Sequence, residues 1–550
     1  MADDPADGSA LDGGQPDWPG WPEEAAERYR SAGYWAGRTF GAYLESWARA
    51  RPDRPALVDG EQTWTYAELH TAAIERACGL HALGVAEGDR VVLHLPNSAE
   101  FALQWFALQL LGAVPVHAMP AHRSAEVRDL LGSSGASAYL IPDRHQRFDY
   151  RPMAAELLRS EPCLRQVVVH GDTGGHPGFT AAGDLASHGT SLPRRGASDP
   201  SGLAALLLSG GTTGRPKLIP RTHDDYAYNA RAAAAASGLT ERSVYLAVLP
   251  MGFNFALACP GVLGTLMTGG TVVVAPDPSP QTAFALIERR GVTITAISPA
   301  LVPYWLDEHA HAPDALSGLQ VLQVGGARLP DASARRLGRE LRVTVQQVFG
   351  MAEGLICVTR LDDPQQLICT TQGRPLSPAD EIRIVDDLGR DVPDGEPGEL
   401  LTRGPYTLRG YYRAPEHNAR SFTPDGFYVT GDIVRRLPSG HLVVTGRSKD
   451  QINRGGEKIA AGEVEEHLLA HPDIKAAALV AAPDERWGER SVAYLVCTQP
   501  PPTPRALADF LRGRGLAAHK APDEVVAVDA LPLTPVGKVD KQALRAGVGA

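Results

Sequence analysis

The chain has 550 residues, of which 43% are apolar and 21% charged, and its formal net charge at pH 7 is −11. This length predicts two to four domains with packed cores, and the acidic balance argues against a nucleic-acid-binding surface, which would need a basic patch. The sequence has no run of about 20 apolar residues, so we expect no membrane span.

The first 20 residues, "MADDPADGSALDGGQPDWPG", are acidic and rich in glycine and proline. They contain neither a basic nor an apolar segment, so they differ from a secretory signal, and we expect a disordered leader over residues 1–20. The six cysteines are scattered, with no CxxC pair and no metal-binding spacing. This pattern favours a reduced, cytoplasmic protein.

From Trp64 onward, predicted helices and strands alternate. The elements in chain order are a helix in "YAELHTAAIERACGLHALG", a strand at Arg90–Leu95, a helix at Ser98–Leu111, a strand at Ala113–Ala118, a helix from Ser124 and a strand at Ser137–Pro142. Such alternation predicts a mostly parallel sheet with helices on both faces. The same pattern returns around "YLAVLP", "TVVVAP", "ITAIS" and "LQVLQVGG", which predicts a second α/β unit.

A glycine-rich stretch lies between these two units. Ala204–Leu208 is predicted to be a buried strand, and the next residues are Ser209, Gly210, Gly211, Thr212, Thr213 and Gly214, with Lys217 three residues later. Backbone N–H groups of such a turn can surround an anion, and the hydroxyls and lysine add donors. A P-loop needs Gly-Lys-Ser/Thr where this chain has Arg215-Pro216-Lys217. The stretch therefore indicates a phosphate loop of another kind or, taken alone, a simple turn.

Beyond Gly373 the pattern changes to short alternating strands with Asp-Gly and Pro-Gly turns. This pattern predicts an antiparallel sheet or a small barrel over about residues 373–445. The segment from Lys449 to the end predicts a separate α/β domain of about 100 residues, an ordinary module size. We therefore expect a core at residues 21–446 and a C-terminal domain at residues 447–550.

Four further motifs accompany the glycine-rich stretch. They are "QQVFGMAEG" at Gln346–Gly354, "FYVTGDIV" with its Gly431-Asp432 pair, "GRSKDQINRGGEK" at Gly446–Lys458, and "PLTPVGKVDK", which places Lys538 on a loop. Taken together, the five motifs resemble the adenylate-forming enzymes: acyl-CoA synthetases, luciferases and nonribosomal-peptide adenylation domains. The resemblance extends from about Trp21 to Leu544.

This resemblance implies an α/β fold. A large N-terminal domain would contain two α/β subdomains and a small β-barrel, and a smaller mobile C-terminal domain would turn about a hinge at Lys449. The segments "WPEEAAERYRSAGYWAGRTF", "KLIPRTHDDY", "QVFGMAEGL" and "GRSKDQINRGGEKIAAGEVE" narrow the resemblance further. They are similar to the stand-alone aryl-acid AMP ligases of siderophore assembly, which activate 2,3-dihydroxybenzoate or salicylate.

The resemblance also implies an ATP site. The β- and γ-phosphates would be held by Ser209, Gly210, Gly211, Thr212, Thr213, Gly214 and Lys217. The adenine would lie beside Gly325, Gly326, Ala327 and Gly350, with Phe349 stacked on the purine. Glu353 would bind Mg²⁺, Asp432 would accept both ribose hydroxyls, and Arg447 would also reach the ribose. Lys538 would bridge the carboxylate of the acid and the α-phosphate.

Each assignment has a simpler interpretation. Glu353 alone could be a solvated surface carboxylate, Asp432 could cap the next element, and Lys538 could be an exposed lysine. His223 is equally consistent with a phosphate neighbour and with a local helix cap. A non-catalytic nucleotide-binding relative would be expected to lose Lys538, Glu353 or Asp432, and all three are present.

The segment "LPMGFNFALACPG" matches the part of these enzymes that lines the aryl-acid site. The resemblance implies that Asn254 bonds the ortho hydroxyl and that Phe255 packs on the ring, with Gly325 and Ala327 nearby. Cys259 stands where dihydroxybenzoate enzymes tend to have serine and salicylate enzymes cysteine, and a thiol is a weak partner for a 3-hydroxyl. Phe253 departs from the usual histidine and makes the pocket entrance more apolar.

The implied reaction is ATP-dependent conversion of an aryl acid, with salicylate favoured, to aryl-AMP and pyrophosphate. The aryl group would then pass to the phosphopantetheine thiol of an aryl carrier protein. Alternative acids are 2,3-dihydroxybenzoate and another substituted 2-hydroxybenzoate or heteroaryl acid. An alternative acceptor is coenzyme A, which would make the protein an aryl-CoA ligase.

Overall fold

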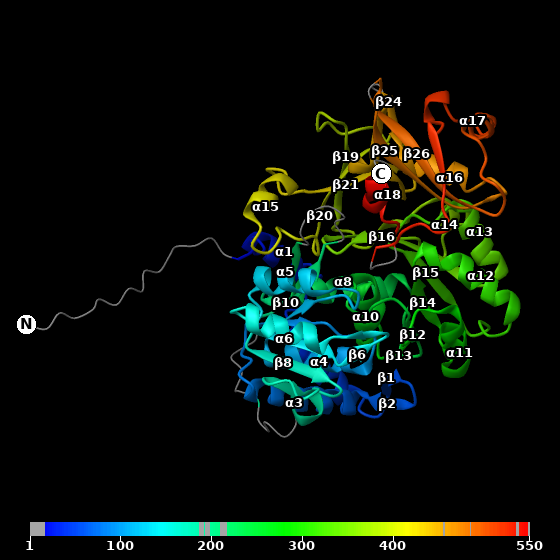
Figure 1. Cartoon of the computed structure of the whole chain (residues 1–550). Helices are drawn as coiled ribbons and strands as arrows, with labels where there is room; N and C mark the ends of the chain where they lie inside the picture. The colour runs from blue at the N-terminus through cyan, green and yellow to red at the C-terminus, as the bar shows by residue number, and fades with distance from the viewer. Residues whose placement is uncertain are drawn as a thin grey trace, which may run out of the picture.

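The computed structural model describes residues 17–185, 192, 199–209, 217–454, 457–484, 486–534 and 538–547. Two large sheets with their helices form the body of the molecule, and the segments coloured yellow to red gather on one side of it (Figure 1). Two sheets of similar build agree with the two α/β units predicted from the sequence. Between them lies most of the largest cluster of buried apolar side chains.

The larger sheet has nine strands in the order β18-β17-β16-β15-β14-β12-β13-β1-β2. Their bounds are β1 Pro55–Asp59, β2 Gln62–Thr65, β12 Val244–Ala247, β13 Thr271–Val274, β14 Ile294–Ile297, β15 Val321–Gly325, β16 Thr344–Met351, β17 Gly354–Val358 and β18 Arg374–Pro375. The strands from β1 to β16 pair in parallel, and antiparallel pairs occur only towards the two edges. The carboxyl ends of β15 and β16 bring Gly325 and Gly350 to one edge of the sheet.

The second sheet has seven strands in the order β11-β10-β4-β3-β5-β8-β9. Their bounds are β3 Arg90–Leu93, β4 Val114–His117, β5 Ala138–Pro142, β8 Gln166–His170, β9 Phe179–Ala181, β10 Leu203–Leu208 and β11 Leu218–Thr222. All neighbours are parallel except β10 and β11. The two strands that flank the glycine-rich stretch are therefore adjacent in space.

Helices cover both sheets. Those of the body are α1 Glu23–Ser31, α2 Phe40–Ala50, α3 Tyr66–Ala82, α4 Ala99–Leu111, α5 Ser124–Ser134, α6 Arg151–Ser160, α8 His223–Ala236, α9 Asn254–Ala258, α10 Gly261–Thr268, α11 Pro280–Arg290, α12 Val302–His311, α13 Asp331–Glu340, α14 Gln365–Thr370 and α15 Pro415–Ser421. Helix α4 is buried along nearly its whole length. An apolar surface all round a helix requires such burial. Ser98 caps its start by accepting the Phe101 N–H, and Gly112 ends it at φ 81°.

A four-stranded antiparallel sheet follows, in the order β19-β20-β21-β22. Its strands are β19 Glu381–Val385, β20 Gly398–Arg403, β21 Tyr428–Arg436 and β22 Leu442–Arg447. This is the antiparallel sheet that the turn-rich segment predicted, and the described pairings form an open sheet rather than a closed barrel. Asp432 lies within β21, opposite Arg447 of β22, so the interpretation that it caps the next element is wrong.

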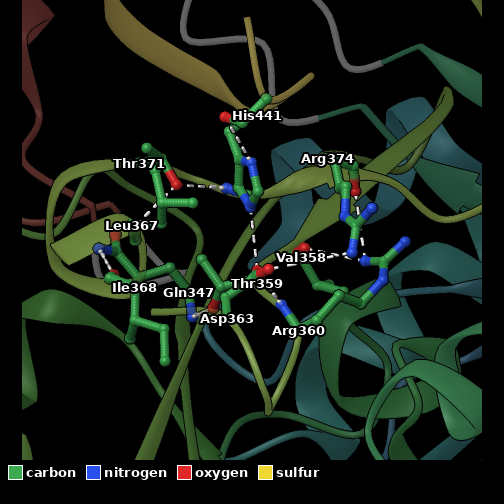
Figure 2. A network of polar contacts seen from close by, with 12 residues as sticks. Gln347, Val358, Thr359, Arg360, Asp363, Leu367, Ile368, Thr371, Arg374 and His441 are labelled. Atoms are coloured by element: carbon green, nitrogen blue, oxygen red, sulfur yellow. Dashed lines mark hydrogen bonds and ion pairs between the residues drawn. The ribbon is translucent and has the colours of Figure 1, made fainter. Parts of the chain in front are cut away.

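The hairpin of β21 and β22 is attached to the nine-stranded sheet through a buried polar network (Figure 2). The imidazole of His441 bonds to Asp363 Oδ2 at 2.9 Å, and the Arg360 N–H donates to the same oxygen at 2.6 Å. Burial raises the pKa of the Asp363 carboxyl, but these donors outweigh burial and lower it overall. The network fixes Asp432 and Arg447 relative to the strands that flank Glu353.

The C-terminal segment has its own sheet and its own apolar cluster. Strands β24-β23-β26-β25 pair in that order, and β27 pairs with β26. The elements are β23 Gln451–Arg454, β24 Glu457–Ala460, α16 Ala461–Leu468, β25 Ile474–Asp484, β26 Gly488–Cys497, α17 Pro504–Gly513, β27 Glu524–Ala527 and α18 Lys541–Gly547. An ion pair of 2.7 Å between Arg328 and Glu466 joins α16 to the loop after β15.

Residues 1–16 of the expected leader lie outside the described residues. The remainder of that leader differs from the expectation, because Asp17 accepts hydrogen bonds from Arg413 at 2.8 Å and from Tyr412 at 2.9 Å. Trp18 packs against the apolar cluster of the seven-stranded sheet. In the part of the chain that the structure describes, no helix is both long and apolar enough to cross a membrane.

Candidate active site

A cavity of about 300 Å³ lies where the two large sheets, the four-stranded sheet and the C-terminal segment meet. Residues expected at the site that line it are Ser209, Lys217, Phe253, Asn254, Phe255, Cys259, Gly326, Gly350, Glu353, Arg447, Lys449 and Lys538. Residues 210–214 of the glycine-rich stretch lie outside the described residues. Most of the site residues predicted from five separate motifs therefore come together around one cavity.

The described ends of the glycine-rich stretch are joined to each other. The Ser209 N–H donates to the Lys217 carbonyl at 3.0 Å, and the Lys217 N–H donates to Ser209 Oγ at 3.2 Å. These bonds hold Ser209 and Lys217 next to each other at the cavity. Burial lowers the pKa of the Lys217 amine, and the nearby Glu353 carboxylate opposes that shift.

Four of the expected residues do not line the cavity directly: Gly325, Ala327, Phe349 and Asp432. Phe349 packs against the apolar cluster that contains Leu355 and Leu400. Because side chains alternate along a strand, Val348 and Gly350 of β16 face the cavity instead. Stacking of Phe349 on a purine stays a prediction.

Gly325 and Gly326 both occupy positions that favour glycine, each for a different reason. A Cβ atom at Gly325 would lie 2.7 Å from the Val348 carbonyl oxygen and 2.9 Å from the Phe255 ring, which leaves no room for a side chain. Gly326 has φ +87°, a conformation that favours glycine. The side chain of Lys538 approaches Gly326, with its Cε 3.9 Å from the Cβ position.

Glu353 is a buried carboxylate with a tyrosine partner. The Tyr411 hydroxyl donates to Glu353 Oε1 at 3.0 Å and lies 2.9 Å from the Tyr428 hydroxyl. Burial raises the pKa of the Glu353 carboxyl, while the bond from Tyr411 and the nearby cations oppose that shift. The simple surface-carboxylate interpretation of Glu353 is therefore wrong. Sequence reasoning did not identify Tyr411 and Tyr428, which both line the cavity.

Asp432 and Arg447 form an ion pair beside the cavity. The Arg447 Nε donates to Asp432 Oδ1 at 2.8 Å, and the Asp432 N–H donates to Thr430 Oγ1 at 3.0 Å. Burial raises the pKa of the Asp432 carboxyl, and the adjacent Arg447 and Lys538 cations oppose this. The pair can offer a carboxylate acceptor and a guanidinium donor to a polar ligand in the cavity.

Lys538 reaches the cavity from the loop that follows β27. This loop is held by two bonds, from the Thr534 N–H to the Lys538 carbonyl at 2.7 Å and from the Lys538 N–H to Thr534 Oγ1 at 3.2 Å. Burial and, secondarily, the positive charge of Arg447 lower the pKa of the Lys538 amine to about 8. The exposed-lysine interpretation is therefore wrong, and the amine is placed to neutralise an anion.

The other end of the cavity is apolar and contains one amide and one thiol. Phe253 and Phe255 line it with Asn254, the first residue of α9, and Cys259. Asn254 Nδ2 donates to Cys259 Sγ at 3.6 Å. Burial raises the pKa of the Cys259 thiol to about 12, so it is protonated at neutral pH. This end can accommodate an aromatic ring and hydrogen-bond one polar substituent.

His223 does not cap its own helix. Thr222 caps α8 in a reciprocal arrangement with Asp225, so His223 is not the cap of α8. The His223 Nδ1 instead accepts the Phe40 N–H at 3.2 Å. His223 is not among the residues that line the cavity.

Comparison with known proteins agrees with this geometry. Residues 44–412 match the AMP-binding enzyme family, and residues 463–538 match the AMP-binding enzyme C-terminal domain. The chain is 52% identical to the 2,3-dihydroxybenzoate-AMP ligase of Bacillus subtilis (strain 168), over 96% of this chain and 97% of that protein. It is 51% identical to the salicyl-AMP ligase / salicyl-S-ArCP synthetase of Mycobacterium tuberculosis, over 97% and 95%. The apo structure of MbtA from Mycobacterium smegmatis aligns with a TM-score of 0.75 and 48% identity, over 96% of this chain and 98% of that one.

Proposed function

Because the chain belongs to the AMP-binding enzyme family, as an aryl-acid AMP ligase, we propose that it converts salicylate and ATP to salicyl-AMP and pyrophosphate. The salicyl group then passes to the phosphopantetheine thiol of an aryl carrier protein. One observation supports this proposal above the others. A single cavity is lined both by the charged side chains of Lys538, Lys217 and Glu353 and by Asn254 and Cys259.

Adenylation joins two anions, since a carboxylate attacks the α-phosphorus of ATP and pyrophosphate leaves. The protein contributes charge neutralisation and alignment, because phosphoryl chemistry demands little else from it. The Lys538 amine would bind both the carboxylate and the α-phosphate, while Lys217 and the loop beginning at Ser209 bind the leaving phosphates. Asp432 and Arg447 would hold the ribose.

Glu353 would hold Mg²⁺ together with the nucleotide. The carboxylate is buried, faces the cavity and is held in one orientation by Tyr411. Among the described residues, no group of three or more His, Cys, Asp and Glu side chains could hold a metal ion. Mg²⁺ is commonly bound by one or two carboxylates together with substrate phosphates, which this arrangement fits. Bound there, it would neutralise charge on the phosphates.

We propose that thioester formation uses a different geometry, in which Lys538 has left the cavity. We infer that the C-terminal segment rotates about Lys449, which lies in a one-turn 3₁₀ helix at Ser448–Asp450. The Arg328–Glu466 ion pair at 2.7 Å joins the segment to the body in the present arrangement, and the Asp450–Arg545 pair at 2.6 Å lies within the segment beside the hinge. The rotation would remove Lys538 from the cavity and bring the face around residues 454–457 towards it.

The residue at position 259 should determine whether salicylate or 2,3-dihydroxybenzoate is the better substrate. The Cys259 thiol already accepts an N–H from Asn254 and is a weak partner for a 3-hydroxyl group. A buried hydroxyl without a good partner loses about 1–3 kcal/mol, so we expect a preference of about tenfold or more for salicylate over 2,3-dihydroxybenzoate. Cys259→Ser should narrow this gap. The measurement is kcat/KM for each acid in ATP–pyrophosphate exchange, and a wild-type enzyme that uses the dihydroxy acid equally well would refute the assignment.

Phe253 should widen the range of acids. It is partly buried among apolar side chains at the edge of the pocket, so it offers a ring only apolar surface. A methyl or halogen substituent should then change binding by only about 1–3 kcal/mol. We expect Phe253→His to discriminate more strongly between salicylate and a methylsalicylate in the exchange assay. If the ranking of salicylate, methylsalicylate and benzoate is the same in both proteins, Phe253 does not contribute to selection of the acid.

The proposed function is tested by ATP–pyrophosphate exchange with a panel of aryl acids. Salicylate should support exchange, and aryl transfer should then depend on a phosphopantetheinylated carrier protein. Transfer of equal efficiency to free coenzyme A would instead favour an aryl-CoA ligase.

A further inference from the structure

A buried hydrogen-bonded chain lies behind the apolar end of the cavity. Tyr226 of α8 donates its hydroxyl hydrogen to Asn254 Oδ1 at 2.9 Å, and Asn254 Nδ2 donates to Cys259 Sγ at 3.6 Å. Tyr226 is fully buried, its ring lies edge-on to Phe40, and the Arg221 guanidinium lies 4.9 Å from the ring centroid. These contacts leave the tyrosine little freedom to move.

The chain fixes which way the Asn254 amide faces. Burial holds the pKa of the Tyr226 phenol well above its usual value, so the hydroxyl keeps its hydrogen. Among the described residues, the Tyr226 hydroxyl forms its hydrogen bond with the Asn254 amide. If the amide were flipped, its NH₂ group would face the Tyr226 hydroxyl. The hydroxyl hydrogen would then be buried without an acceptor, which costs free energy. Oδ1 therefore faces Tyr226.

The remaining N–H of Asn254 is then available to a ligand. An amide nitrogen carries two hydrogens, and one of them is directed at Cys259 Sγ. Asn254 lines the cavity, so the group it presents there is a donor. A bound acid must supply an acceptor at this point or leave the donor unpaired.

We propose that Tyr226 is a positioning residue for substrate selection: by fixing the Asn254 amide, it makes the pocket select aryl acids with a hydrogen-bond acceptor ortho to the carboxylate. This inference rests on the proposed function. A phenolic oxygen qualifies, because it can donate to its own carboxylate and still accept from Asn254. A ring nitrogen adjacent to the carboxylate-bearing carbon also qualifies. An ortho amino group does not, because its lone pair is delocalised into the ring and it presents N–H donors.

The wild-type enzyme should rank four probe acids accordingly. Salicylate and picolinate (pyridine-2-carboxylate) should exceed anthranilate and benzoate by about tenfold or more in kcat/KM for ATP–pyrophosphate exchange, the scale for one unpaired buried donor. Anthranilate used as well as salicylate would overturn the inference and leave aryl-acid adenylation intact. Failure of every aryl acid would instead refute the proposed function.

Tyr226→Phe tests the positioning role. Without the hydroxyl, the amide is free to turn and present Oδ1 to the ligand, so kcat/KM for anthranilate should rise while that for salicylate falls. The KM for ATP should not change. A uniform loss with all acids would assign Tyr226 a purely structural role and overturn the proposal.

Tyr245→Phe is the matched control. Tyr245 is also fully buried, but its hydroxyl has no recorded hydrogen-bond partner among the described residues. Its loss should leave the salicylate-to-anthranilate ratio at the wild-type value, and a ratio that shifts as in Tyr226→Phe would contradict the proposal. If Tyr226→Phe does not fold, as judged by thermal unfolding, Asn254→Asp provides the second test. An acceptor-only carboxylate there should reverse the preference in favour of anthranilate, and an unchanged preference would overturn the proposal.

Discussion

Replacing Lys538 by alanine should lower the rate of adenylation by about 10²–10³-fold, the scale for loss of one positioned donor to a developing charge. The amine is buried in the cavity between Arg447, Asp432 and Glu353, and its loop is fixed by Thr534. The other lysines and arginines among the described residues that line the cavity are Lys217, Lys449, Arg420 and Arg447, and none of them belongs to the C-terminal loop that carries Lys538. The measurement is kcat in ATP–pyrophosphate exchange.

The same variant should form the thioester normally from presupplied aryl-AMP, because the inferred rotation has by then removed Lys538 from the site. Lys541→Ala is the matched control. Lys541 lies three residues away and pairs with Glu465 at 2.6 Å, outside the cavity. It should retain near wild-type exchange. Equal impairment of both half-reactions by Lys538→Ala would contradict the rotation.

The pKa of Lys538 also predicts a pH dependence. Burial lowers this pKa to about 8, so the amine loses its proton and its charge as the pH rises through that value. Adenylation at low ATP concentration should therefore decline above about pH 8, and bound phosphate, being anionic, should move the decline to higher pH at saturating ATP. This alkaline decline should be absent from Lys538→Ala.

Replacing the buried Asp432 by alanine should raise the KM for ATP by about 10–100-fold, because a hydrogen bond to a charged group contributes about 1.5–3 kcal/mol. The carboxylate would lose its proposed bonds to the ribose, and Arg447 would lose the partner that holds it at 2.8 Å. The KM for the aryl acid should change much less, since Asn254 and Cys259 lie at the other end of the cavity. Steady-state kinetics with each substrate varied in turn measures both values.

The control for Asp432 is another aspartate that pairs with the same sheet. Asp394 bonds to Arg436 of β21 at 2.7 Å, but the Asp394 side chain is 46% exposed, against 4% for Asp432. Exposed pairs contribute about 0–1 kcal/mol, so Asp394→Ala should leave the KM for ATP near its wild-type value. An unchanged KM for ATP in Asp432→Ala would show that this carboxylate does not hold the nucleotide.

The two α/β units could be predicted from the sequence because their strands are apolar on both faces and alternate with helices. The strand predicted at Arg90–Leu95, for example, is β3 at Arg90–Leu93. The sequence pattern did not predict where β21 ends or which side chains of β16 face the cavity, because both depend on backbone geometry. Gly431 resembles a strand end, yet its φ of +72° lets β21 continue through Asp432. Likewise, the alternation along β16 turns Val348 towards the cavity and Phe349 away from it.

The side chains that orient the site could not be found from the sequence. Tyr411 bonds to Glu353, from which it is separated by 58 positions in the sequence, and Tyr226 bonds to Asn254, from which it is separated by 28. Buried tyrosines are ordinary core residues in a sequence, and nothing in their spacing distinguishes these from Tyr245. Their roles depend on hydrogen bonds between elements that meet only in the fold.

The proposed function requires that one cavity bring ATP and an aryl acid together for adenylation. ATP–pyrophosphate exchange, measured with the purified full chain and salicylate, is the decisive measurement. We expect exchange that requires the acid, is much weaker with benzoate, and falls by about 10²–10³-fold in Lys538→Ala. Exchange that proceeds without any aryl acid, or that no aryl acid supports, would contradict it.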